Sequence, residues 1–291
     1  MDSEILRKYA QLIVKVGVNV QPGQEVVISS ELDQPEFTEL LTEECYLAGA
    51  SEVRVEWTHQ PLKLLHVNYQ SVETLGRVKE WEKQKLLDRA ENLPCMIYIE
   101  SEDPNGLDGM DQEKWGKSVQ MRWGIIKPIR DSMENKYQWC IAAVPGKKWA
   151  KRVFPELSTE EAVEKLWQAI LYTSRADVDG IAAWREHNAD LKRRCDYLNS
   201  LGLRELKYRS SNGTDFTVGL IPQAEASSTS SGEGSGSTTS KSRAPRGSSA
   251  CAPNARPWFR DTGTKASGAR WRTCRSETSA RRRFQPWNWS R

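Results

Sequence analysis

Three histidines, His59, His66 and His187, offer the widest range of chemistry in this 291-residue sequence. A histidine can bind a metal ion, or it can act as a general acid or base near neutral pH. His59 and His66 are seven residues apart, a spacing that would place both on one face of a helix. However, neither an H-x-x-x-H pair nor a suitably spaced carboxylate completes a metal set. We therefore interpret the three as surface or packing residues, and we expect His187 on the solvent side of a helix.

Residues 103–111, DPNGLDGMD, superficially resemble a calcium-binding loop because oxygen-bearing side chains recur in them. A calcium loop of the EF-hand type needs glycine at its sixth position, where this sequence has Asp108. Leu107 occupies the preceding ligand position, and Pro104 stiffens the start of the segment. We therefore predict a loop that caps the helix that follows it.

Two pairs of adjacent carboxylates could form an acid/base dyad if their side chains met: Glu43 with Glu44, and Glu160 with Glu161. Adjacent residues of a helix point to different faces, so we predict that neither pair does so. Glycine-rich phosphate-binding motifs of the types G-x-G-x-x-G and G-x-x-x-x-G-K-[ST] do not occur in the sequence. The two lysines that follow Gly146 are therefore interpreted as a basic step at the end of a strand.

The cysteines are widely spaced, at Cys45, Cys95, Cys140, Cys195, Cys251 and Cys274. No C-x-x-C pair occurs, which excludes a zinc ribbon or a thioredoxin-type motif and favours free thiols in a reducing compartment. The first four lie in predicted strands or on apolar helix faces, so we expect them to pack in the core. No Cys-His or Ser-His-Asp arrangement has a supporting spacing. From the residues alone, we predict no catalytic, cofactor-binding or metal-binding residue.

Short apolar segments alternate with helical patterns over residues 1–225. The predicted strands are residues 25–29, 53–57, 95–99, 139–144, 205–209 and 215–220, and the predicted helices span about 33–49, 61–93, 110–135, 158–171 and 177–201. Strands separated by helices pair mostly in parallel, through right-handed crossovers. We therefore predict an α/β fold, a three-layer domain with a mostly parallel sheet, with the last two strands as a closing antiparallel hairpin.

Two helix starts carry capping signals. Asp33 is followed by Pro35 and Glu36, which predicts a capping box, and Gly49 suits the stop of that helix. Ser158 with Glu161 predicts a second capping box.

Charge divides the chain at about residue 225. Residues 226–291 carry 13 Lys/Arg and 3 Asp/Glu, whereas residues 1–225 carry 29 Lys/Arg and 36 Asp/Glu. The second part contains no Leu, Ile, Val, Met, Tyr or His. Such a composition cannot bury enough apolar surface to offset the entropy of ordering, so we predict a disordered basic tail.

Three interpretations of this tail stay open. An out-of-frame translation of GC-rich coding DNA, a frameshift, explains the abrupt change and is the one we favour. A natural flexible tail is the second. The third is a segment that binds single-stranded nucleic acid through arginines and tryptophans, but repeated motifs are missing and we do not expect a nucleic-acid partner.

No apolar run approaches the roughly 18–20 residues that a membrane span needs. The charged residues 1–8 lack the apolar centre of a signal peptide. We therefore expect a cytoplasmic protein without a membrane partner.

Residues 6–24 (LRKYAQLIVKVGVNVQPGQ), residues 48–50 with the strand at 53–57, and residues 212–220 (NGTDFTVGL) follow one another in a specific order. Together they resemble the N-terminal domain of the thermophilic metallo-aminopeptidase family, the aminopeptidase T, aminopeptidase S and PepS group. The resemblance covers essentially all of residues 1–225. It implies a cytoplasmic, homodimeric, two-domain exopeptidase with two divalent metal ions, zinc or cobalt. A metal-bound water would attack the N-terminal peptide bond of a peptide substrate.

In that family the metal ligands (two Glu, two His and an Asp) and a nearby Tyr belong to the second domain. This sequence departs from the family pattern after residues 223–225, and the tail contains no His and only Glu233, Asp261 and Glu277 as acids. No ligand can be carried over, so we expect no metal ion to bind this chain and predict a truncated, inactive fragment. The alternative is a non-catalytic dimerisation or binding module whose basic tail contacts nucleic acid or acidic partners.

Overall fold

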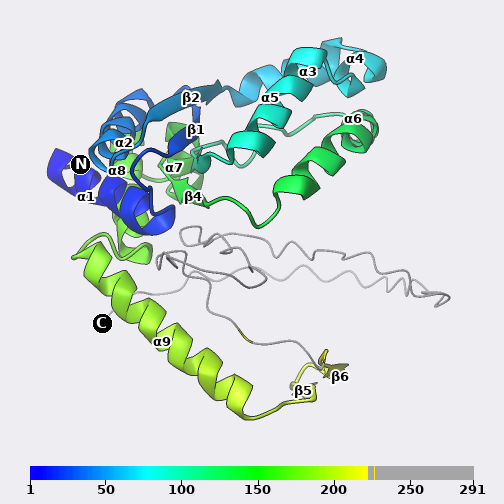
Figure 1. Ribbon diagram of the computed structural model, residues 1–291. Helices are drawn as coiled ribbons and strands as arrows, with labels where there is room; N and C mark the ends of the chain where they lie inside the picture. Colours follow the sequence, from blue (N-terminus) through cyan, green and yellow to red (C-terminus); the bar gives the residue numbers. More distant parts are fainter. Residues whose placement is uncertain (222–225, 227–291) are drawn as a thin grey trace. The chain divides into compact units, whose positions relative to one another are not determined.

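A computed structural model describes residues 1–221 and residue 226 (Figure 1). The elements follow in the order α1 (Ser3–Leu12), a π-helical turn (Ile13–Gly17), β1 (Glu25–Glu31), α2 (Pro35–Leu47), β2 (Glu52–Thr58), α3 (Gln60–Tyr69), α4 (Val72–Gly76), α5 (Glu80–Asn92), β3 (Cys95–Glu100), α6 (Gln112–Met133), β4 (Trp139–Ala143), α7 (Lys147–Val153), α8 (Thr159–Thr173), α9 (Gly180–Ser200), β5 (Glu205–Arg209) and β6 (Asp215–Gly219). The predicted disordered tail lies outside the described residues, except for Ala226.

Four parallel strands form one sheet in the order β2-β1-β3-β4, and β5 pairs with β6 in an antiparallel hairpin. In register, Glu25 of β1 lies opposite Glu52 of β2, and Val26 of β1 lies opposite Cys95 of β3. The predicted parallel sheet and closing hairpin are confirmed. Each strand begins within one residue of its predicted start. In the parallel sheet, apolar and β-branched runs bounded by turn residues mark the strands, whereas the exposed β5 and β6 are marked by alternating polar and apolar residues on either side of a turn.

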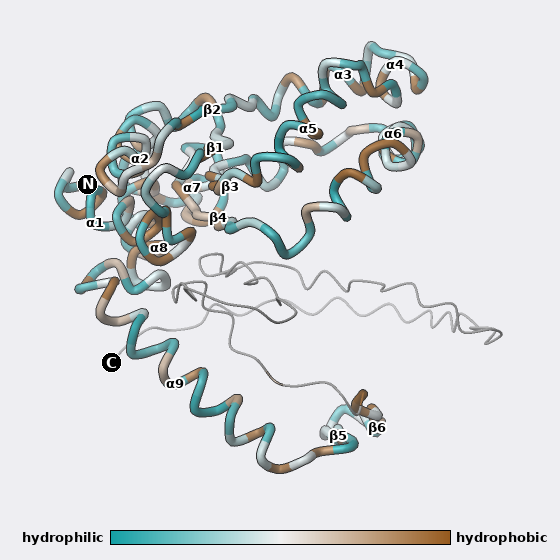
Figure 2. The backbone as a smooth tube through the Cα atoms, viewed as in Figure 1, coloured by the Kyte–Doolittle hydropathy of each residue, from teal (hydrophilic) through white to brown (hydrophobic). Residues whose placement is uncertain are grey.

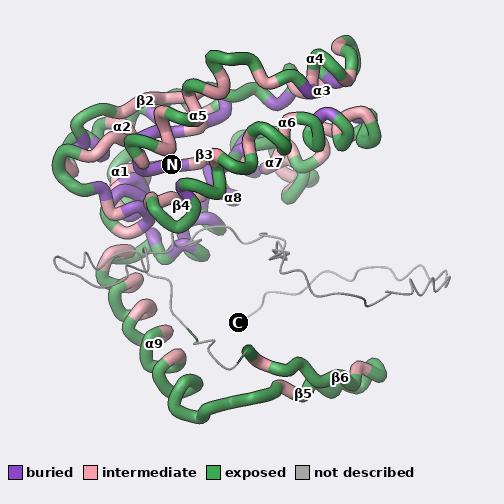
Figure 3. Tube along the Cα trace, turned by 45° about the vertical axis from the view of Figure 1, so that its right-hand side comes forward, coloured by how far each residue is buried: buried purple, intermediate pink, exposed green. Residues whose placement is uncertain are grey.

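One face of the sheet carries the main core. Alternate residues of a strand point to opposite faces, and Val26, Ile28 and Ile97 face the helices α1, α2 and α8. An aromatic cluster fills this layer: the ring of Tyr9 lies 5.6 Å from that of Phe37 and 6.0 Å from that of Trp167, between centroids. Figure 3 shows buried residues concentrated in this part of the domain.

The opposite face of the sheet is more polar and packs against α5 and α6. Glu56 of β2 forms an ion pair with Lys85 of α5 at 2.8 Å, and Arg54 pairs with Asp88 of the same helix at 3.6 Å. Figure 2 shows the hydrophilic residues along α5 and the mixed hydropathy of α6. The sheet between two helical layers makes the predicted three-layer α/β domain.

Some predicted helices differ from the structure. The stretch predicted as one helix over residues 61–93 is divided into α3, α4 and α5. The break comes where the Ser71 hydroxyl accepts a hydrogen bond from Thr74 N–H and starts α4 as its N-cap. The second capping box is confirmed, because Ser158 and Glu161 hydrogen-bond each other's backbone at the start of α8. Among the described residues, no helix combines the length and apolar character that crossing a membrane requires.

Candidate functional site

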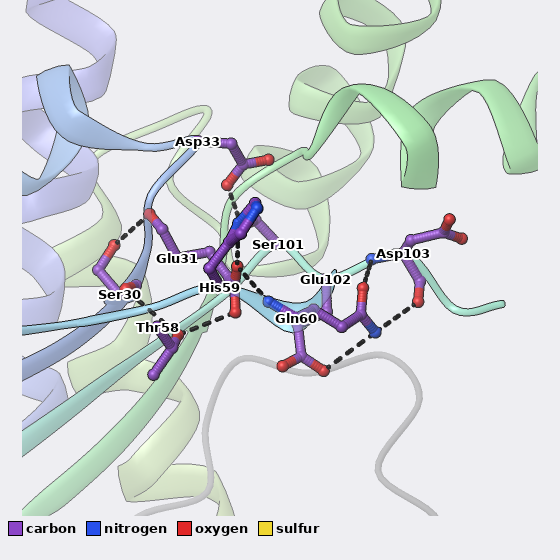
Figure 4. A network of polar contacts seen from close by, with 9 residues as sticks. All are labelled: Ser30, Glu31, Asp33, Thr58, His59, Gln60, Ser101, Glu102 and Asp103. Carbon is purple, nitrogen blue, oxygen red and sulfur yellow. Dashed lines mark hydrogen bonds and ion pairs between the residues drawn. The ribbon is translucent and has the colours of Figure 1, made fainter. Parts of the chain in front are cut away.

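Polar side chains gather where β1, β2 and β3 end (Figure 4). From β1 the chain crosses to β2 on one side and then to β3 on the other, so the order of connection reverses between β1 and β3. In open α/β sheets, ligands bind outside the carboxyl ends of the strands at such a reversal. The network at these strand ends is therefore the first candidate site.

Glu31, the last residue of β1, forms the centre of this network and is almost fully buried, with 6% of its surface exposed. Its Oε1 accepts a 2.9 Å hydrogen bond from the Thr58 hydroxyl, and its Oε2 accepts one of 3.1 Å from Gln60 N–H. Both partners belong to the junction between β2 and α3. The buried carboxylate thus ties the ends of two neighbouring strands together and stabilises the start of α3.

Asp33 joins β1 to β3 at the same edge. Its Oδ1 accepts a 2.7 Å hydrogen bond from the hydroxyl of Ser101, the first residue after β3. The prediction that Asp33 caps the following helix is wrong: the N-cap of α2 is Gln34, whose side chain makes no capping bond, and Pro35 begins the helix. The Asp33 carboxylate therefore accepts a hydrogen bond from the distant Ser101 and does not cap the helix that follows it in sequence.

The segment after β3 is held by Gln60. The Gln60 amide donates to the Asp103 carbonyl oxygen at 2.9 Å and accepts from Asp103 N–H at 3.1 Å. A Cβ on Gly106 would come within 2.2 Å of Gln60 Oε1, so a larger residue there would displace the Gln60 amide from its bonds with Asp103. The predicted capping role of the loop is confirmed, because Asp111 accepts a 2.9 Å hydrogen bond from Lys114 N–H at the start of α6.

Two further carboxyl groups lie at the end of β3, Glu100 and Glu102. Both residues keep an exposed surface, yet partial loss of hydration at the carboxyl raises the pKa of Glu100, and the charges of Glu102 and Glu31 raise it further. The pKa of Glu102 is raised by burial and by Glu31, while Lys63 lowers it. Carboxyl groups with raised pKa values at a strand end are typical of functional sites, although structural networks also produce them.

The histidines do not share a helix face. His59 precedes α3 as its N-cap, and its Nδ1 lies 3.9 Å from Oε2 of the buried Glu31. No local pattern predicts this carboxylate neighbour, because Glu31 belongs to another strand. His66 lies in the last turn of α3, where its Nδ1 is 3.1 Å from Nε2 of Gln70. His187 is half-buried, with its ring edge-on to Trp184 and its Nδ1 in an exposed 3.4 Å contact with Nη2 of Arg175, so the predicted position on the solvent side of its helix holds in part.

The adjacent carboxylates Glu43 and Glu44 meet in one ion pair. Each accepts from Nη1 of Arg7 at 2.8 Å, which raises the pKa of that guanidinium. Their exposures differ, as expected for different helix faces, at 57% for Glu43 and 3% for Glu44, and the long arginine side chain reaches both from α1. Lys147 and Lys148 are the first residues of α7, with three residues between it and the end of β4, so they belong to a helix that was not predicted from the sequence.

Three cysteines, Cys45, Cys95 and Cys140, are buried, and Cys195 is half-buried. Burial raises the pKa of the Cys45 and Cys95 thiols to about 12 in each case. The predicted packing role is confirmed for the first three. Cys251 and Cys274 lie outside the described residues.

The donor groups at the strand ends do not fit a two-metal centre. Among residues 1–221 and 226, no three His, Cys, Asp or Glu side chains lie close enough together to hold a metal ion. Glu31, the best-placed carboxylate, already accepts bonds from Thr58 and Gln60. No catalytic step is therefore assigned to a metal ion at this site.

The fold and the site define the class of protein: an open, parallel α/β domain with a polar network at its switch point. A family model described as thermophilic metalloprotease (M29) matches residues 2–239, and the chain belongs to this family. The resemblance inferred from the sequence is thereby confirmed.

Several curated aminopeptidases are similar to the chain. Aminopeptidase PepS of Streptococcus thermophilus is 36% identical over 223 residues, which are 75% of this chain and 53% of that protein. Aminopeptidase T of Thermus thermophilus is 33% identical over 217 residues, 74% of this chain and 53% of that protein. The solved structure of wild-type AmpT from Thermus thermophilus superposes with a TM-score of 0.66 at 30% identity, covering 75% of this chain and 53% of that one. The chain spans about half the length of the curated relatives it matches.

Proposed function

We propose that this chain provides the N-terminal α/β domain of a metal-dependent aminopeptidase, which releases N-terminal amino acids from peptides. The single observation that supports the proposal is the family match over residues 2–239, with aminopeptidases as the similar curated proteins. In such an enzyme two divalent metal ions, zinc or cobalt, would supply the nucleophilic water. The donor groups described above do not fit that role, so the metal ligands would belong to a second domain.

It follows that the 291-residue chain on its own does not hydrolyse peptides. Purified chain is incubated with a tripeptide and zinc or cobalt, and free amino acid is measured, with and without a chelator. We expect no release above the level without enzyme. Metal-dependent release of the N-terminal residue would show that the chain itself is active and would contradict this part of the proposal.

The coding DNA offers an independent test. We expect resequencing across codons 220–230 to reveal that another reading frame continues with an α/β pattern that contains Glu, His, His and Asp. In that case residues 226–291 are a frameshift product and the intact gene encodes the whole aminopeptidase. If no frame continues the family pattern, the frameshift hypothesis is wrong.

The charge division of the chain favours a second function, that of a binding module, because 13 Lys/Arg in residues 226–291 contrast with the acidic excess before them. A basic segment would attract nucleic acid in a salt-dependent way. The test is binding of a labelled single-stranded oligonucleotide at two salt concentrations, with and without residues 226–291. Binding that survives the deletion would rule this function out.

A further inference from the structure

A cavity of about 310 Å³ lies between α5, α6 and the polar face of the sheet, on strands β2 and β3. It is lined by residues other than those of the network at the strand ends. Cavities that bind small molecules begin at roughly this size. The residues that line it give it a distinct chemistry.

Positive charge predominates in the cavity. Its ionised side chains are Lys85, Arg89, Arg122 and Arg130 against Glu56 and Glu82. Glu56 pairs with both Lys85 and Arg89, and Glu82 pairs with Arg122 at 2.9 Å. Two cationic groups are thus left without an acidic counterpart of their own.

Arg130 and Arg89 have unused hydrogen-bonding capacity. Within the described part of the chain, Arg130 forms no ion pair with a carboxylate, and its guanidinium lies 5.9 Å from the centroid of the Trp123 ring. Arg89 pairs with Glu56, yet its buried Nε has no hydrogen-bond partner among the described residues. Because that Nε is shielded from the cavity, an oxyanion in the cavity would contact the terminal Nη groups of Arg89 and Arg130.

Two tyrosines, Tyr98 and Tyr137, line the cavity together with Arg89 and Arg130. Burial raises the pKa of the Tyr98 hydroxyl and Tyr137 raises it further, whereas the positive charges of Arg89 and Arg130 lower it. The cavity therefore offers phenol groups in addition to guanidinium groups as hydrogen-bond donors to an anion.

Apolar side chains complete the lining: Trp81, Leu86, Pro94, Met96, Ile126 and Met133. Methionines adapt to irregular shapes and contact aromatic rings favourably. A lining that combines cationic and apolar side chains suits a molecule that has an oxyanion at one end and an apolar group at the other.

We propose that this cavity binds a small organic oxyanion with an apolar body, whose anionic group contacts Arg89 and Arg130 and whose body packs against Met96, Ile126 and Met133. Carboxylates and phosphates share the required chemistry, because both accept paired N–H donors from arginine. Binding is independent of peptidase activity. The proposal therefore stands or falls separately from the proposed function.

Calorimetric titration of the full 291-residue chain tests the proposal with four probes: 3-phenylpropionate, phenyl phosphate, neutral 3-phenylpropionamide and acetate. We expect one of the two aromatic anions to bind at least about tenfold more tightly than the amide and than acetate, given the strength of hydrogen bonds to charged groups. The better of 3-phenylpropionate and phenyl phosphate identifies the type of oxyanion. Equal binding of both aromatic anions and the amide would overturn the proposal.

Two variants locate the binding. Arg130→Gln removes an exposed charge and is expected to weaken binding of the preferred anion at least about fivefold. Lys127→Gln is the matched control on the same helix, because Lys127 pairs with Asp131 and does not line the cavity. Ile126→Phe narrows the cavity and is expected to weaken the anion and the amide alike. If Arg130→Gln and Ile126→Phe both bind as Lys127→Gln does, with unchanged thermal unfolding, the anion binds elsewhere and the proposal is wrong.

Discussion

The hydroxyl of Ser101 donates a 2.7 Å hydrogen bond to Asp33, which joins the ends of two adjacent strands although the residues are 68 positions apart in the chain. Ser101 is almost completely buried, with 3% of its surface exposed. The contact links the carboxyl ends of β1 and β3, between which the order of connection reverses.

Ser101→Ala is therefore expected to lower the free energy of unfolding by about 1–2 kcal/mol, because a buried hydrogen bond to a carboxylate is lost. Urea unfolding followed by circular dichroism measures the change. Ser132→Ala is the control, since the Ser132 hydroxyl bonds only the Ile129 carbonyl oxygen of its own exposed helix turn. Equal stabilities of the two variants would show that the Asp33 contact contributes nothing.

Gly146→Ala is expected to destabilise the fold by about 2 kcal/mol or more, because overpacking forces the backbone to shift. A Cβ at this position would lie 2.1 Å from the Ser101 carbonyl oxygen. The matched control is Gly116→Ala in α6, where a Cβ would meet no atom within 4 Å. That variant is expected to gain up to about 1 kcal/mol from helix propensity. Thermal and urea unfolding compare the two, and a stable Gly146→Ala variant would contradict the close approach.

Glu100→Gln is expected to stabilise the protein at pH 7 and to have little effect at pH 4. The folded-state pKa of Glu100 is raised, so the folded chain binds this proton more tightly than the unfolded chain. The associated stability is present at low pH and is lost as pH rises above the ordinary value of 4.5. Urea unfolding across this pH range measures it. A loss of stability at pH 7 would contradict the raised pKa.

Glu56→Gln is expected to show the opposite sign and serves as the counterpart. Burial disfavours the charge of Glu56, but hydrogen bonds from Arg89 and Lys85 outweigh this effect and lower its pKa. Its contribution to stability is present above the ordinary pKa of 4.5 and is lost as pH falls through the lowered value. The variant should therefore be less stable at pH 7 and approach the parent protein in acid. The same urea series measures both variants.

Thiol labelling should divide the cysteines into two classes. Burial raises the pKa of Cys45 and Cys95 to about 12, so little reactive thiolate forms at pH 8. In a Cys251→Ser/Cys274→Ser background, we expect the half-buried Cys195 to react with Ellman's reagent first, and the buried cysteines only after unfolding. Rapid labelling of a second thiol in the native protein would show that the core opens readily.

The strands were predictable because their signal is local. Residues 95–99 form an apolar run and residues 205–209 alternate polar with apolar side chains, both beside turn residues, and the structure has strands that begin at both positions. The role of Asp33 was not predictable in the same way. Its neighbours Pro35 and Glu36 favour Asp33 as a helix cap. In the folded state, however, the Asp33 carboxylate accepts a hydrogen bond from Ser101, which is distant in sequence.

The two sites depend on such distant partners. His59 has no carboxylate beside it in sequence, and Glu31 approaches it only because β1 and β2 lie side by side. The cavity combines Arg89 of α5 with Arg130 of α6, two helices whose spacing no periodicity reveals. Sequence patterns predict the elements, whereas the packing of elements against one another decides which side chains meet.

The strand order also determines when each strand can find its partner while the chain is being synthesised on the ribosome. Glu25 pairs with Glu52, so β1 and β2 can associate soon after both have left the exit tunnel. The other edge of β1 can pair with β3 only after Cys95 has been synthesised, and β3 can pair with β4 only after Trp139 has been synthesised. Until then, open strand edges are exposed to other nascent chains, and parallel pairings of this kind form slowly. We therefore expect the yield of soluble protein to depend on translation speed and on chaperones between the codons for β2 and β4.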